Sequence, residues 1–132
     1  MRRVLATLLL CACASGCATT GVRPGAARLT DDRGIASYVA SRFDGHATSS
    51  GQRYDERRLT AAHRTLPFGT RVRVTNTENG RSVVVTITDR GPFKRGRVID
   101  VSKRAATELG FVRQGTARVR LEVVTDTDAA ER

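Results

Sequence analysis

Residues 60–106 read TAAHRTLPFGTRVRVTNTENGRSVVVTITDRGPFKRGRVIDVSKRAA, and this segment is the most informative about the fold. Apolar β-branched residues alternate with polar ones over 70–76, and valines and isoleucine recur at every second position over 82–88. This period is expected of strands with one buried face. Asn79-Gly80 lies between the two segments, and an Asn-Gly pair readily adopts the positive φ of a tight hairpin turn. The sequence therefore predicts a β-hairpin at the centre of the chain.

Short elements are predicted on both sides of this hairpin. Ser102 is a good N-cap for a helix that continues to Leu109 and ends at Gly110. About a hundred residues remain once the two ends of the chain are set aside, which is enough for one domain with a single core. The remaining segments predicted as strands or short turns are 34–39, 60–63, 98–101 and 119–123.

Three blocks of the central stretch occur together, namely AAHRTLPFGT (61–70), VTN (74–76) and DRGPF (89–93). Their order and spacing resemble the rare lipoprotein A family, secreted murein-cleaving enzymes of bacterial envelopes. The resemblance covers roughly residues 34–124 and implies a mainly β fold, a six-stranded double-psi β-barrel with one or two short helices. It also implies a peptidoglycan lytic transglycosylase. We expect a short form, without the C-terminal peptidoglycan-binding repeat domain that many members carry.

The ends of the chain differ in composition from a folded domain. Arg2 and Arg3 precede a short apolar run, which predicts a signal peptide of the lipoprotein type over residues 1–16. This run is too short to span a bilayer as a stable helix. The predicted organisation is then a flexible tether over 17–33, the barrel over 34–124 and a polar tail over 125–132.

The three cysteines, Cys11, Cys13 and Cys17, all lie near the N-terminus, so a disulfide framework is excluded for the mature domain. Residues 14–17 (ASGC) resemble a lipobox and predict acylation at Cys17. Residues 10–13 (LCAC) offer a competing site at Cys13, and cleavage to a soluble periplasmic protein is a third possibility. Two or more acyl chains would hold the protein firmly at a membrane. Ala18 after Cys17 then predicts an outer-membrane lipoprotein that faces the periplasm.

The charge of the chain predicts an anionic partner. The signal peptide contains two of the 23 basic residues and no acid, so the mature chain has 21 basic and 13 acidic residues and a formal charge of +8. A basic domain attracts polyanions. Nucleic acid is disfavoured by export and by an aromatic content of 5%, because bases stack on exposed rings. We expect a monomer that binds peptidoglycan glycan strands, whose N-acetylmuramic acid has a lactyl carboxylate.

Asp89 is the main candidate for catalysis. Cleavage of the β-1,4 bond between N-acetylmuramic acid and N-acetylglucosamine requires a proton for the leaving oxygen and stabilisation of oxocarbenium-like charge. One carboxylate is sufficient when the C6 hydroxyl of the substrate replaces water and forms a 1,6-anhydro product. Asp89 follows the predicted strand and precedes the rigid turn Arg90-Gly91-Pro92, which would direct it into a groove. An aspartate that only ties this turn is the alternative.

The resemblance assigns functional roles to Asp89 and His63, and His63 would orient Asp89 or bind a sugar hydroxyl. Gln52 departs from the pattern, because family members have a second functional acid there. An amide transfers no proton near neutral pH, although it can hydrogen-bond a hydroxyl. Tyr38-Val39 stands where two aromatic residues are common. The predicted substrate-binding residues are Tyr38, Gln52, Arg64, Arg90 and Phe93.

The sequence has no cluster of histidines, cysteines or paired acids at ligand spacing, so neither a metal nor another cofactor is predicted. The leading hypothesis is a lytic transglycosylase that acts through Asp89 with His63. The alternative is a non-catalytic peptidoglycan-binding or expansin-like wall-loosening lipoprotein with the same barrel, and Gln52 favours it.

Overall fold

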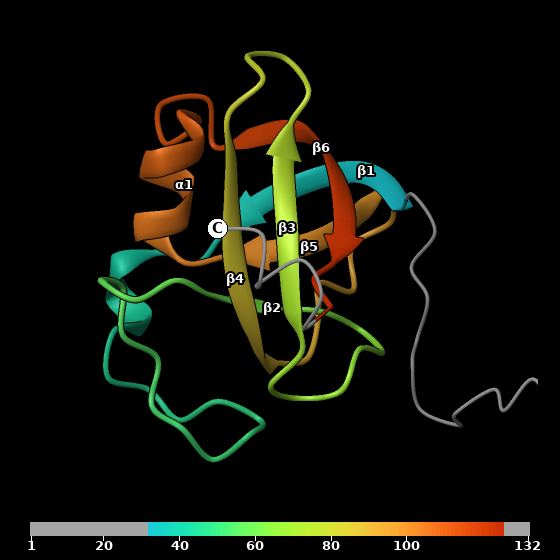
Figure 1. The fold of residues 1–132 in the computed structure, drawn as a ribbon. Coiled ribbons are helices and arrows are strands. Elements are labelled where there is room, and N and C mark those ends of the chain that lie inside the picture. The colour runs from blue at the N-terminus through green and yellow to red at the C-terminus, as the bar shows by residue number, and fades with distance from the viewer. Residues whose placement is uncertain (1–31, 126–132) are drawn as a thin grey trace, which may run out of the picture.

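The computed structural model describes residues 32–125, which form a closed barrel of six strands and one α-helix (Figure 1). The mainly β fold predicted from the sequence is confirmed. The elements are β1 (Asp32–Tyr38), the 3-10 helix η1 (Ser41–Phe43), β2 (Thr60–Ala62), β3 (Arg71–Asn76), β4 (Ser82–Asp89), β5 (Arg97–Val101), α1 (Lys103–Leu109) and β6 (Thr116–Val123). The predicted signal peptide, nearly all of the predicted tether and most of the polar tail lie outside the described residues.

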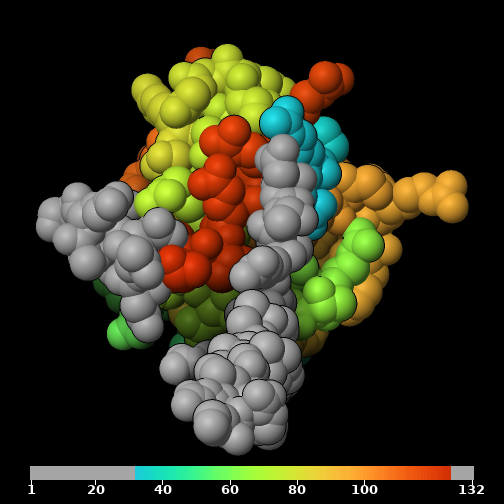
Figure 2. Space-filling view, turned by 45° about the vertical axis from the view of Figure 1, so that its right-hand side comes forward, coloured from blue at the N-terminus to red at the C-terminus, as the bar shows by residue number. Residues whose placement is uncertain are grey.

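The strands follow the order β1-β5-β2-β4-β3-β6 around the barrel, and β6 closes it by pairing with β1. Two of the six pairs are parallel, β1 with β5 and β2 with β4. Figure 2 shows β6, in red, beside β1, in cyan, on the face where the barrel closes. No strand edge is left open, so every strand has two backbone partners.

The core follows from the alternation in the sequence. Side chains at every second position of β3 and β4 point inward and are buried, and the residues between them, most of them charged or hydroxyl residues, point outward. The buried side chains of these and the other strands form one cluster that includes Val72, Val74, Val85, Ile87, Ile99 and Leu121. The predicted turn is confirmed at Gly80, whose φ is +77° and whose amide donates to the carbonyl of Asn76.

Helix α1 lies against β4 and covers one part of the barrel (Figure 1). The predicted N-cap is confirmed, because the Ser102 hydroxyl accepts a hydrogen bond from the amide of Ala105. Gly110 ends the helix in the left-handed conformation, as expected for this position. Ala105, Ala106 and Leu109 form the buried face. No helix within residues 32–125 is long and apolar enough to cross a membrane.

A long loop, residues 44–59, connects η1 to β2 and lies beside one end of the barrel, in teal and green in Figure 1. Tyr54 is buried and anchors the loop. Its hydroxyl donates to the carbonyl of Val39 at 3.3 Å and accepts from the amide of Lys103 at 3.1 Å. A second anchor is the Ser50 amide, which donates to the carbonyl of Thr88 at 3.2 Å. These contacts hold the loop over the end of β4, and a groove forms between the loop and the barrel wall.

Candidate active site

Asp89 is the last residue of β4 and lines this groove. The Oδ1 atom of its carboxylate accepts three hydrogen bonds, from the Ser49 amide (3.0 Å), the Ser49 hydroxyl (2.7 Å) and the Arg90 amide (2.8 Å). Oδ2 has no hydrogen-bond partner among residues 32–125. The three donors fix the orientation of the carboxylate, so one oxygen is held and the other is free for a ligand in the groove.

A β-bulge accounts for the direction in which Asp89 points. Inward and outward side chains alternate along β4, and Ile87 points inward, so regular alternation would place Asp89 inward as well. The register between β2 and β4 shifts at Ala61/Ala62, where Ala62 pairs with Asp89 instead of Thr88. As a result, the consecutive residues Thr88 and Asp89 both line the groove. Bulges often redirect a side chain beside an active site.

A second carboxylate, Asp100 of β5, lines the same groove. Ala62 of β2 pairs with Asp89 on one side and with Asp100 on the other, so the three residues form one row across three strands. Adjacent strands lie about 4.8 Å apart, which puts the two aspartate Cα atoms about 10 Å apart. The Asp100 carboxylate also accepts a hydrogen bond from the hydroxyl of Ser37, the next residue in the row. The small side chain of Ala62 leaves the space between the two acids open.

The groove is about 290 Å³ in volume and combines these acids with hydroxyl and aromatic side chains. Burial is the largest influence on Tyr54 and raises the pKa of its phenol, and the nearby charge of Glu56 adds to this effect. Phe43 and His46 form an edge-to-face pair with ring centroids 5.8 Å apart. The full lining is Val39, Phe43, His46, Ala47, Thr48, Tyr54, Thr60, Ala61, Ala62, Thr88, Asp89, Arg90, Asp100 and Ser102.

His63 lies next to Asp89 through the backbone but not through its side chain. Its amide donates to the carbonyl of Asp89 at 3.1 Å. Its imidazole Nδ1 accepts from the amides of Thr65 (3.2 Å) and Leu66 (3.1 Å), so the neutral ring carries its proton on Nε2. The ring lines a separate cavity of about 210 Å³ with Asp32, Arg64, Thr65 and Val98. Ser49, and not His63, orients the Asp89 carboxylate, and the catalytic role of His63 stays a prediction that these contacts do not support.

The environment of His63 favours its neutral form. The ring is 5% exposed, and this burial is the main reason why its pKa is lowered. Asp32 acts in the opposite direction, whereas the positive charges of Arg90 and Arg64 lower the pKa further. The neutral imidazole accepts hydrogen bonds from two backbone amides and thereby stabilises the loop after β2.

Arg64 and Arg90, two of the predicted substrate-binding residues, join the loops that flank the site. Arg64, in the loop after β2, donates to the carbonyls of Pro92 (2.6 Å) and Arg97 (2.5 Å). Arg90, in the loop after β4, donates to the carbonyls of His63 (3.1 Å) and Leu66 (2.7 Å). Each loop is thus held by an arginine from the other. Arg90 also lines the groove, whereas Arg64 does not.

The other predicted binding residues lie at different places. Phe93 is 81% exposed in the loop between β4 and β5, and its ring is free for a partner. Tyr38 packs its ring edge on Phe111, with centroids 6.0 Å apart, and its hydroxyl donates to the carbonyl of Val112. It is absent from the groove lining, so its contacts are those of a structural residue. The binding roles of these residues stay predictions.

Gln52 is exposed and lies in a continuation of the groove, beyond the cavity that contains Asp89. Its carbonyl closes a tight turn by accepting from the amide (2.9 Å) and the hydroxyl (2.6 Å) of Thr48. Gly51 in this turn has a φ of +88°, which favours glycine. The side chain of Gln52 has no hydrogen-bond partner among residues 32–125 and faces the solvent-filled groove.

A family model described as lytic transglycolase matches residues 34–121, about two thirds of the chain. The chain belongs to this family. An endolytic peptidoglycan transglycosylase RlpA from Neisseria meningitidis is 56% identical over 97 residues, which cover 74% of this chain and 41% of the relative. A probable endolytic peptidoglycan transglycosylase RlpA from Nostoc sp. is 60% identical over 94 residues, covering 70% of this chain and 25% of the relative. The chain therefore spans less than half the length of these relatives.

Solved structures show the same fold at low sequence identity. The Streptomyces papain inhibitor superimposes with a TM-score of 0.60 and 20% identity, covering 74% of this chain and 97% of the inhibitor. An expansin from Clavibacter michiganensis in complex with cellohexaose gives a TM-score of 0.59 and 20% identity, covering 73% of this chain and 51% of the expansin. The double-psi β-barrel predicted from the resemblance to the rare lipoprotein A family is confirmed.

For this lytic transglycolase domain, the main residue that the sequence analysis missed is Asp100. The sequence indicates Asp100 only as an acid between Ile99 and Val101, the two buried residues of a short strand. The sequence places Asp100 on the outer face of a strand but does not say that β5 pairs with β2 beside Asp89. Ser49 was missed because nothing in a polar turn distinguishes one serine from its neighbours. Within residues 32–125, no group of three or more metal-binding side chains is present.

Proposed function

We propose that this chain is a lytic transglycosylase domain that cleaves the β-1,4 bond between N-acetylmuramic acid and N-acetylglucosamine through Asp89. The observation that carries the proposal is the row Asp89, Ala62 and Asp100 along one groove, with one oxygen of Asp89 fixed by three donors and the other open. The relatives named endolytic peptidoglycan transglycosylase, which are 56 and 60% identical to this chain, support the substrate class.

In this reaction Asp89 acts first as an acid and then as a base. The protonated carboxyl donates its proton to the glycosidic oxygen while the bond from that oxygen to C1 of N-acetylmuramic acid breaks. The C6 hydroxyl oxygen of the same sugar then bonds to C1, and its proton returns to Asp89. The products are a 1,6-anhydro end and a free C4 hydroxyl, and no water is consumed.

Ser49 and Asp100 support this cycle in different ways. The two hydrogen bonds from Ser49 hold Oδ1 of Asp89, so the proton to be transferred sits on Oδ2 and faces the groove. Asp100 places a second carboxylate across Ala62, where its negative charge stabilises the positive charge that develops on the sugar ring. Because Asp100 lines the cavity that contains Asp89 and Gln52 does not, the mechanism does not depend on an acid at position 52.

Two observations favour a second function. Gln52 stands where the family resemblance implies a second functional acid, and a solved structure of the same fold is an expansin with bound cellohexaose. A non-catalytic barrel that binds or loosens the wall would have the same groove without chemistry. Incubation of the purified protein with sacculi, followed by mass spectrometry of the supernatant, separates the two functions. Fragments with 1,6-anhydro ends support the transglycosylase, whereas sedimentation with the sacculi and no released fragments supports the binding protein.

We also propose that the protein is an outer-membrane lipoprotein acylated at Cys17 and facing the periplasm. The support is the N-terminal sequence alone, because these residues lie outside the described part of the structure. Incorporation of labelled palmitate in cells tests it. We expect Cys17→Ala to abolish labelling and Cys13→Ala to leave it unchanged. The reverse pattern would assign the anchor to Cys13. If the wild type and both variants took up no label, the protein would be a soluble periplasmic protein.

A further inference from the structure

The groove does not end at Asp89 but continues along the outer face of β4. Three cavities, of about 290, 590 and 500 Å³, share Thr60 and Thr88 in their linings, so they form one continuous depression. The first contains Asp89 and Asp100, and Gln52 lies in the second and third. We name the third cavity the arginine groove. Its lining is Gln52, Arg57, Arg58, Leu59, Thr60, Thr86, Thr88 and Arg104.

The floor of the arginine groove is a row of hydroxyl groups. Thr60 of β2 pairs with Thr86 of β4, and Thr88 follows two positions along the same face of β4. None of the three hydroxyls has a hydrogen-bond partner among residues 32–125, although Thr88 is only 8% exposed. A floor of this kind can bind a chain of hydroxyl, amide or carboxylate groups. Thr88 directly precedes Asp89 and Thr86 lies three residues before it, so the floor of the arginine groove extends along β4 from beside Asp89 to about 10 Å from it, at roughly 3.3 Å per residue.

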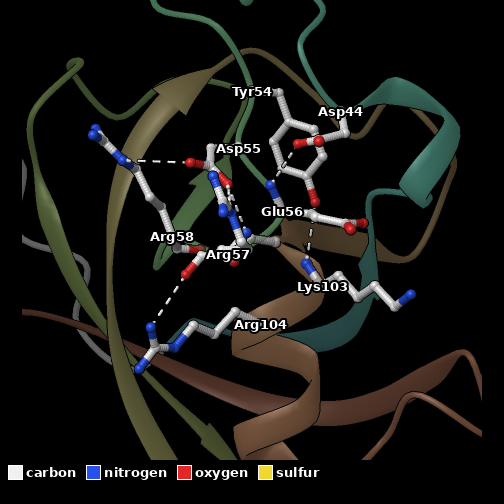
Figure 3. Close-up of polar contacts among 9 residues, drawn as sticks. Asp44, Tyr54, Asp55, Glu56, Arg57, Arg58, Lys103 and Arg104 are labelled. Atoms are coloured by element: carbon white, nitrogen blue, oxygen red, sulfur yellow. Dashed lines mark hydrogen bonds and ion pairs between the residues drawn. The ribbon is translucent and has the colours of Figure 1, made fainter.

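Three arginines surround this floor, and no acid among the described residues lines it. Figure 3 shows Arg57 and Arg58 near Asp55, and Arg104 reaching up from α1 toward them. Asp55 pairs with Arg57 at 3.3 Å and with Arg58 at 3.8 Å, so one carboxylate is shared between two guanidinium groups. The Arg57 and Arg58 side chains are 86% and 74% exposed. Ion pairs this exposed are weak and are readily exchanged for a ligand anion.

We propose that the arginine groove is a subsite for carboxylate groups of peptidoglycan, while Asp89 acts on the neighbouring glycosidic bond. Guanidinium groups bind carboxylates through two parallel hydrogen bonds, and surrounding hydroxyls accept or donate to the rest of the chain. An uncharged residue such as Gln52 suits a carboxylate subsite. Gln52 lines both the second cavity and the arginine groove, and an acid there would pair with Arg57 or Arg58 and repel an anionic ligand. The glycan identity of the ligand rests on the proposed function.

Peptidoglycan offers two sources of such a carboxylate. One is the lactyl group of N-acetylmuramic acid, which is ionised only where the stem peptide has been removed. The other is the stem peptide, with its own free carboxylates. The shared chemistry is a carboxylate attached to the glycan about one sugar away from the scissile bond. The two sources are separated by using three ligands, namely peptide-free glycan chains, the same chains with the lactyl carboxyl converted to a methylamide, and peptide-bearing chains.

The test measures the affinity of each ligand by titration calorimetry in an Asp89→Asn background, which prevents cleavage during binding. The test variant adds Arg57→Gln and Arg58→Gln, and the matched control adds Arg113→Gln and Arg118→Gln, two exposed arginines away from the groove. Both pairs remove two positive charges, so a difference between them reports position and not net charge. Circular dichroism of each variant shows that the barrel is folded.

Compared with Asp89→Asn alone, we expect the Arg57/Arg58 variant to bind carboxylate-bearing glycan at least tenfold more weakly. Its affinity for the methylamide glycan should be nearly the same as that of Asp89→Asn. The control pair should change each affinity less than twofold. A loss confined to peptide-free chains assigns the lactyl carboxylate, and a loss confined to peptide-bearing chains assigns the stem peptide. Equal losses for carboxylate and methylamide ligands, or no loss, would overturn the proposal. Arginine-dependent binding without cleavage by the wild-type protein would overturn the proposed activity and leave the subsite standing.

Discussion

At the scale of single residues, the orientation of Asp89 is the feature that separates a catalytic acid from a turn aspartate. The Ser49 hydroxyl supplies the shortest of its three hydrogen bonds. Ser49→Ala keeps the amide donor and removes this bond, so we expect the rate of anhydro-fragment release from sacculi to fall about tenfold. Ser50→Ala in the same turn is the control, because its hydroxyl contacts Thr48 and not Asp89. Equal rates in the Ser49 variant and the wild type would show that orientation by Ser49 is unimportant.

His63 provides a prediction on stability against pH. Its pKa is lowered in the folded protein, mainly by burial, from an unfolded value near 6.5. As the pH falls below about 6.5, the unfolded chain binds a proton at this residue before the folded protein does. The free energy of unfolding therefore decreases on acidification, until the pH passes below the lowered pKa.

Urea titrations between pH 7 and pH 5 measure this dependence. We expect His63→Gln to lose part of the decrease in unfolding free energy over this range, because the titrating group is gone. If the His63 variant kept the full wild-type slope, the folded and unfolded pKa values of His63 would have to be equal.

At the level of elements, the loops after β2 and β4 are joined by two arginines, Arg64 and Arg90, each of which donates hydrogen bonds to carbonyls of the other loop. Arg90→Ala removes two hydrogen bonds to carbonyls and the contact of the guanidinium with the Phe68 ring, whose centroid lies 4.0 Å from Cζ. We expect the free energy of unfolding to fall by about 2 kcal/mol. Arg71→Ala, on the exposed face of β3, should change it by less than about 0.5 kcal/mol. Urea denaturation followed by circular dichroism measures both values. A similar loss of unfolding free energy in the two variants would show that the contacts of Arg90 with the loop after β2 add no stability.

Elements with a local signal were predictable from the sequence. β3 and β4 follow from the alternation of Val72, Val74, Val83 and Val85, and their turn follows from Asn79-Gly80. The ends of α1 follow from the capping residues. The bulge in β4 had no local signal, because it depends on how β2 pairs with β4, and the sequence alone gives no pairing register for a three-residue strand. The direction of the Asp89 side chain depends on this bulge.

At the scale of the whole molecule, the groove is a product of the barrel topology. β2 lies between β4 and β5, so Ala62 joins Asp89 and Asp100, which are separated in the sequence by the loop 90–96 and the first residues of β5. The family resemblance predicted the barrel and Asp89, whereas periodicity and motifs could not pair Asp100 with it. They also placed Arg64, Arg90 and Tyr38 at a binding surface, whereas the hydrogen bonds of these side chains go to backbone carbonyls. Local patterns specify residue types, and the closed sheet specifies which of them meet.

In the proposed mechanism the cleavage of glycan strands depends on the carboxylate of Asp89, and a comparison of three proteins measures this dependence. The purified wild type, Asp89→Asn and Glu78→Gln proteins are incubated with sacculi, and fragments with 1,6-anhydro-N-acetylmuramic acid ends are counted by mass spectrometry. Glu78 is an exposed acid of the turn between β3 and β4 and lines none of the three cavities of the groove. We predict release by the wild type and by Glu78→Gln, and a loss of at least a hundredfold in Asp89→Asn with sacculus binding retained. Release by Asp89→Asn at the wild-type rate would contradict the assignment.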